Sequence, residues 1–131
     1  MLILFTMASD VVSLDNKTLT HIATIPVTEG LGIYSSARVI SDGNGTSKAM
    51  GIANISLLAI NAGLGSYILF GKPSHYNTLR MIHHIMGFTA IGTALGMTIA
   101  ASLDNKVPTH VKYVSGGYTL MTTVPIFVFN F

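Results

Sequence analysis

The chain has 131 residues, of which 50% are hydrophobic and only 9% are charged, and its formal net charge is +2. Soluble domains usually carry charge on about a quarter of their residues, so this chain lacks the side chains of a water-exposed surface. It has no cysteine, which excludes disulfides, thiolate metal sites, iron–sulfur clusters and covalently attached c-type haem. Its cations are scattered, without the basic stripe that nucleic-acid binding requires. The composition therefore predicts an integral membrane protein with no nucleic-acid partner.

The N-terminal segment 1–14, MLILFTMASDVVSL, is too short to cross a bilayer and lacks the basic region of a signal peptide. We expect it to form a short helix that is interfacial or partly inserted. Beyond it lie four apolar stretches close to the roughly 20 residues that a membrane-spanning helix needs. The predicted spans are about 18–40, 48–70, 77–103 and 108–131. The first is the weakest, because it contains Pro26 and Glu29.

Short polar connections separate these stretches. They are SDGNGTSK (41–48), GKPSHYN (71–77) and DNKVP (104–108), rich in the Gly, Asn and Pro of turns and helix ends. Helices joined by such short loops run antiparallel to their neighbours. The predicted fold is therefore all-α: a single transmembrane domain over 1–131, built as an up-down four-helix bundle with a short N-terminal helical segment. The protein would cross its membrane several times.

One decapeptide occurs twice, as SLDNKTLTHI at 13–22 and as SLDNKVPTHV at 102–111, with seven of ten positions identical. In the predicted topology the two copies enter the membrane from opposite faces, which is the arrangement of an inverted repeat. One interpretation is a shared helix-end device, in which Asp and Asn satisfy free amides and Thr caps the next helix. That interpretation does not explain the histidine, His21 or His110, that ends both copies.

His21 and His83 form the first candidate site. Each lies less than about two turns inside its span, on the same face of the membrane, so the two would have similar heights in neighbouring helices. Only one of the adjacent His83 and His84 faces inward. The residues that share a face with each are small for His83 and bulky for His84: Gly87, Ala90 and Ala94 against Phe88, Ile91 and Leu95. The small face leaves room for a flat macrocycle or a close helix, which favours His83.

Two imidazoles from facing helices are the usual axial ligands of a b-type haem in a membrane bundle. We therefore predict haem b with His21 and His83 as ligands of its iron. Arg80, three residues before His83, would meet a propionate or a lipid headgroup. The alternative is that the GxxxG of GTALG (92–96) marks a helix-packing surface only. His110 has no histidine partner in the second span, so one haem is expected.

The string LRMIHHIMGFTAIGTALGM (79–97) resembles the haem-ligand helix of transmembrane b-type cytochromes. Those helices often have an Arg one turn before a His, a Gly four residues after it and then a run of small residues. The matching positions here are Arg80, His83 or His84, and Gly87. The resemblance implies electron transfer through one or two haems, often with a quinol or another redox protein as partner.

Glu29 is the only glutamate and lies about midway along the first span, where a carboxylate is energetically expensive. It is a candidate for a proton relay or a quinol-facing group. Alternatively it joins helices by bonding to a polar residue of the second span: Asn54, Ser56 or Asn61. If the span is interrupted at Pro26, it lies near water.

Two functions remain after these observations. The first is a membrane b-type cytochrome, or a cytochrome-like subunit of a respiratory or photosynthetic complex, which carries electrons rather than acting as a stand-alone enzyme. The second is a cofactor-free structural or assembly subunit whose partners are lipid, other membrane subunits or a second copy of the chain. A third function is transport, with the chain as half of an inverted-repeat carrier that works as a dimer and has Glu29 on its transport path. The small size of the chain makes this function less favoured than the other two.

Overall fold

The computed structural model describes residues 16–129, and side chains for these except 16–18, 21 and 124–129. The helix expected at 1–14 lies outside the described residues. Within them, four helices follow one another: α1 (Asn16–Asp42), α2 (Gly45–Phe70), α3 (Tyr76–Leu103) and α4 (Thr109–Phe129). No strand occurs in residues 16–129, so the all-α prediction is confirmed. The helix bounds agree with the four expected spans to within a few residues.

α1 continues without a break through Pro26, so the idea that the span is interrupted there is wrong. Proline removes one backbone hydrogen bond from a helix interior. Threonine side chains stabilise the same stretch of α1, because the Thr28 hydroxyl donates to the carbonyl oxygen of Thr24 at 3.0 Å and lies 3.3 Å from that of Ile25. Membrane helices tolerate proline through such local contacts. As a result, Glu29 is the middle residue of a continuous helix.

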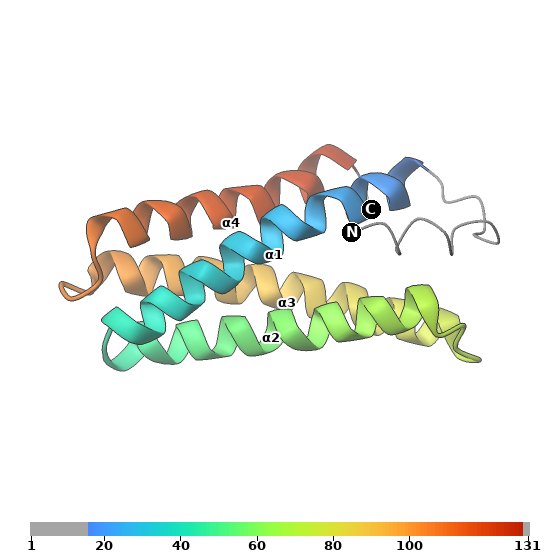
Figure 1. Ribbon diagram of the computed structural model, residues 1–131, viewed down its shortest axis with the longest axis horizontal. Coiled ribbons are helices and arrows are strands. Elements are labelled where there is room, and N and C mark those ends of the chain that lie inside the picture. Colours follow the sequence, from blue (N-terminus) through green and yellow to red (C-terminus); the bar gives the residue numbers. More distant parts are fainter. Residues whose placement is uncertain (1–15, 130–131) are drawn as a thin grey trace, which may run out of the picture.

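The four helices lie side by side along the long axis of the molecule (Figure 1). Each helix packs against its neighbour in sequence, and α4 also packs against α1. α1 and α3 lie across the bundle from each other and contact each other at few points, one of which is Ser36 of α1 against Met97 of α3. The connections 43–44 and 104–108 lie at one end, and the connection 71–75 lies at the other (Figure 1).

Asp104 ties the two connections at the first end together. Its carboxylate accepts hydrogen bonds from the backbone N–H of Asn44 at 2.8 Å, from the backbone N–H of Lys106 at 2.9 Å, and from the hydroxyl of Ser47. These donors stabilise the ionised carboxylate. Led by the Ser47 hydroxyl, they lower the pKa of Asp104 from 3.8 to about 2. In the second decapeptide, therefore, the aspartate satisfies free amides, as the helix-end interpretation predicts.

Asp104→Asn is expected to lower the thermal stability of the protein at pH 7 and to matter much less at pH 2. The pKa of Asp104 is lower in the folded than in the unfolded chain, so its contribution is complete above the unfolded pKa of 3.8 and is lost as the pH falls towards about 2. Melting of both proteins in detergent micelles, followed by circular dichroism at the two pH values, measures this. An equal difference in melting temperature at both pH values would contradict the assignment.

Among the described side chains, the buried ones are confined to one half of the molecule. In α1 the first buried residue is Gly32 and in α2 the last is Leu58, while in α3 the first is Ala90 and in α4 the last described one is Thr119. We call residues 32–58 and 90–119 the packed half. We call residues 19–31, 59–89 and 120–123 the histidine half; none of its described side chains is buried. Among the described residues, the helices therefore pack most tightly in the half that contains Asp104 and the connections 43–44 and 104–108.

The interior of the packed half is partly polar. Asn54 of α2 is fully buried, and its amide donates to the Ser36 hydroxyl of α1 at 2.9 Å. The Thr93 hydroxyl of α3 lies 3.0 Å from Asn54 Oδ1 and also bonds its own helix. The Ser36 hydroxyl in turn donates to the sulfur of Met97. One asparagine therefore links three helices.

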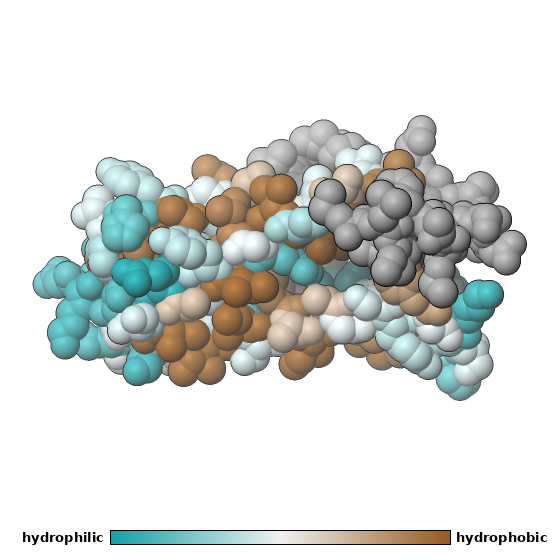
Figure 2. Space-filling model, in the orientation of Figure 1, coloured by the Kyte–Doolittle hydropathy of each residue, from teal (hydrophilic) through white to brown (hydrophobic). Residues whose placement is uncertain are grey.

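Large apolar side chains, in contrast, lie on the outside. Ile52 and Ile60 of α2 and Phe88, Leu95 and Ile99 of α3 are all about half exposed. In Figure 2, hydrophobic surface runs along the middle of the molecule, and hydrophilic surface gathers at the end that carries the connections 43–44 and 104–108. Several large apolar side chains of α2 and α3 are therefore exposed, although the packed half also has an apolar core that includes Met97 and Tyr118.

Candidate functional site

His83 points from α3 towards α2 and lies against Gly65. A Cβ atom built on Gly65 would come within 2.9 Å of Cε1 of the His83 ring, a separation at which two carbon atoms clash. The His83 side chain is half-buried and the His84 side chain is exposed, although their ring centroids are only 6.2 Å apart. A glycine at position 65 thus makes the room that the inward histidine occupies.

The two faces of α3 differ as the spacing predicts. Ala90 and Ala94, which follow His83 on its face, are buried. Phe88 and Leu95, which follow His84, are 56% and 49% exposed. Gly87 leaves an open surface one turn from His83, where a Cβ would meet only the Asn61 amide, at 3.9 Å. The ring of His83 therefore sits above a row of small residues that faces the other helices.

His21 lies near the start of α1, at the same end of the molecule as His83, and its side chain is outside the described ones. The sequence interpretation assumed that α1 and α3 are neighbours. In the structure they lie across the bundle from each other. Packed helices have axes about 8–10 Å apart, which puts diagonal axes at about 11–14 Å. A group held by both helices would therefore occupy the space between α2 and α4.

Arg80 lies at the same helix end as this pair, whereas His110 lies at the other. Arg80 is exposed near the start of α3, on the connection 71–75 side. His110 is exposed at the start of α4, at the opposite end from His83. No group of three or more His, Asp or Glu side chains that would hold a metal ion occurs among the described residues. Of the residues singled out in the sequence, His21, Arg80, His83 and His84 therefore lie at one helix end and His110 at the other.

The prediction of a haem between α1 and α3 can be compared with the burial of the described side chains at that end. Its two axial ligands would come from α1 and α3 at one end, and two histidines suffice for a b-type haem. The histidine half has no buried side chain among those described, whereas the packed half is filled by Met97 and Tyr118. The small surface at Gly87 adds room next to His83. Haem b with His21 and His83 as its ligands therefore stays a prediction.

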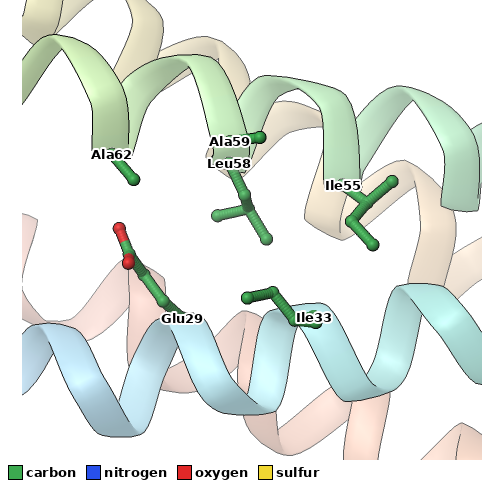
Figure 3. A pocket seen from close by; sticks show the side chains of 6 residues that line it. All are labelled: Glu29, Ile33, Ile55, Leu58, Ala59 and Ala62. Carbon is green, nitrogen blue, oxygen red and sulfur yellow. The ribbon is translucent and has the colours of Figure 1, made fainter.

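Glu29 reaches from α1 towards α2 (Figure 3). It lines a half-open groove of about 160 Å³ whose other walls are apolar: Ile33, Ile55, Leu58, Ala59 and Ala62. Asn54, which the sequence offered as its partner, bonds to Ser36 and Thr93 instead. Among the described residues, no hydrogen bond reaches the Glu29 carboxylate. The carboxylate therefore faces the groove and does not join the two helices.

Sequence reasoning missed the partners of Asn54 and the groove. Ser36 and Thr93 stand out neither by type nor by spacing, because serine and threonine are common along all four helices. The groove depends on how α1 and α2 are set against each other. Neither feature is encoded in the periodicity of a single helix.

Two of the four helices, α2 and α3, are long and apolar enough to cross a membrane, each with a best-window mean hydropathy of 1.5. Only 11% and 22% of these windows is buried inside the molecule, unlike the core helices of soluble proteins. Comparisons of the chain with protein-family models, curated proteins and solved structures find no match. The functional proposal therefore rests on the residues and their arrangement.

Proposed function

We propose that the chain is an integral membrane protein that crosses the bilayer four times as an up-down four-helix bundle. The large exposed apolar side chains on α2 and α3 support this, because they suit lipid and not water. Buried polar side chains such as Asn54 and Ser36 bond to each other between helices, as in membrane bundles. With the exception of Glu29, the charged side chains of the described helices lie towards the helix ends.

Within this bundle, one b-type haem lies between α1 and α3 in the histidine half, and the protein carries electrons as a cytochrome or a cytochrome-like subunit of a larger complex. The observation that carries the proposal is the inward ring of His83 against Gly65, in a half where no described side chain is buried. His21, at the same end of α1, supplies the second ligand.

The bound haem supplies a one-electron redox centre. The residues of this chain hold and orient it. Gly65 makes room for the His83 ring on the α2 side. Gly87, which has no side chain, leaves open space one turn from His83. Arg80, near the membrane surface, meets a propionate. The electron passes to a docked redox protein or a quinol.

The test is an optical spectrum of the purified protein, oxidised and then reduced with dithionite, for wild type, His83→Ala and His84→Ala. The wild type and His84→Ala are expected to show a sharp α-band on reduction, and His83→Ala is expected to lose it. His84 is the matched control, because it adjoins His83 but is exposed. A band that survives in His83→Ala would refute the ligand, and a featureless spectrum from folded wild type would refute the haem.

A cofactor-free structural or assembly subunit is the second candidate. The row of large exposed side chains on α3, Phe88, Leu95 and Ile99, favours it, since such a face suits a neighbouring helix of another subunit as well as lipid. This function requires a stable association with other membrane subunits or a second copy of the chain. A featureless spectrum, together with a mass in mild detergent above that of one chain, would support it over the cytochrome.

A further inference from the structure

The groove beside Glu29 has a position and a lining that set it apart from the histidine site. Glu29 is the middle residue of α1, so its Cα lies about 20 Å from either helix end at 1.5 Å per residue. The groove opens sideways between α1 and α2, past the exposed side chains of Ile33 and Ala59 (Figure 3). A molecule would reach it from the hydrocarbon layer of the membrane. Lipid headgroups, at the helix ends, do not extend that far.

The carboxylate is the only charged group of the groove, and nothing on the described helices neutralises it. Arg38, on the same helix, is about 13 Å further along at 1.5 Å per residue and is paired with Asp42 at 2.7 Å. The five other lining residues carry no oxygen or nitrogen in their side chains. A carboxylate in apolar surroundings is unfavourable unless it is protonated or meets a counter-charge, and among the described residues no hydrogen bond between helices explains the presence of Glu29.

The size and chemistry of the groove restrict what supplies that counter-charge. Calcium takes 6–8 oxygen ligands, and magnesium needs octahedral coordination. Among the residues that line the groove, only Glu29 has oxygen atoms in its side chain, so the groove does not suit either metal ion. An apolar cavity of about 150 Å³ is large enough to hold benzene, and this groove measures about 160 Å³. A neutral ring of that size would fill the space but leave the carboxylate without a counter-charge.

We propose that the groove lined by Glu29, Leu58 and Ala62 binds a monovalent organic cation, an ammonium group on an apolar body about the size of a benzene ring. The ammonium group lies against the Glu29 carboxylate, and the apolar body lies against Ile55, Leu58 and Ala62. The cation enters sideways, from the membrane interior. This site is independent of the haem.

Equilibrium dialysis of radiolabelled benzyltrimethylammonium against the protein in phosphatidylcholine nanodiscs tests the proposal. We expect saturable binding to the wild type, with one site per chain, above that of empty nanodiscs. Glu29→Gln, which keeps the shape and removes the charge, is expected to weaken binding about tenfold or more. Asp42→Asn is the control, because it removes a carboxylate at the end of α1, outside the groove, and it should bind as the wild type does.

Ala62→Leu provides a second, independent variant, since it fills the groove and keeps the carboxylate. It is also expected to lose binding, and circular dichroism of every variant verifies that the helices are intact. Absence of saturable binding to the wild type would overturn the proposal. So would equal binding to the wild type and Glu29→Gln, or wild-type binding by a folded Ala62→Leu. These results do not depend on whether the preparation contains haem.

Discussion

Gly32→Leu is expected to lower the free energy of unfolding by about 3 kcal/mol or more. A Cβ atom at position 32 would lie 2.7 Å from a ring carbon of Tyr118 and 2.8 Å from a methyl carbon of Leu58. Tyr118 is 1% exposed, so its ring has no space to move into. A leucine at position 32 would therefore force α1 away from α2 and α4 where the packed half meets the histidine half.

Gly30→Leu is the matched control for this prediction. It lies two residues away, on the opposite face of α1, and a Cβ there meets nothing within 4 Å. The free energy of unfolding should stay unchanged or rise slightly, because leucine is a better helix former than glycine. Titration with a denaturing detergent, followed by circular dichroism, measures both variants. Equal losses at positions 30 and 32 would mean that the Tyr118 contact does not limit the approach of α1.

Asn54→Leu is expected to cost about 1–2 kcal/mol of unfolding free energy. The substitution removes the bonds to Ser36 and Thr93, which join α1 and α3 to α2. Two interhelical bonds of less than about 1 kcal/mol each account for most of the cost. The rest of the cost arises because the fully buried Ser36 hydroxyl no longer accepts a hydrogen bond from the Asn54 amide.

A double-mutant cycle separates these contributions. Ser36→Ala and Asn54→Leu share one bond, so their combined cost should be smaller than the sum of the single costs. Ser56→Leu, an exposed position on α2, should have little effect in the same detergent titration. If the costs of Ser36→Ala and Asn54→Leu were additive, the hydrogen bond between them would contribute nothing measurable.

The helices themselves follow from the sequence because their causes are local. Uncharged stretches of the right length, ended by Gly71 or preceded by Pro108, define α2 and α4 within a few residues. The inward direction of His83 also follows from the sequence, because the small residues on its face are spaced along a single helix. Both inferences depend only on the 3.6-residue period of the chain.

The arrangement between helices could not be derived in the same way. The interpretation that put His21 and His83 on neighbouring helices failed because short loops fix which helices are antiparallel and not which ones lie across from each other. The partner of Asn54 and the groove at Glu29 depend on the axial offset between α1, α2 and α3. That offset depends on contacts such as that of Leu58 in α2 with Gly32 in α1, between residues far apart in the chain.

The confinement of buried side chains to one half also determines how the molecule opens. Backbone amides in the packed half, held by Asp104 at one end and Asn54 at the centre, exchange their hydrogens only when the whole protein unfolds. Amides in the histidine half exchange through smaller openings of lower free energy. A ligand that bound in the histidine half would therefore raise the free energy of that local opening.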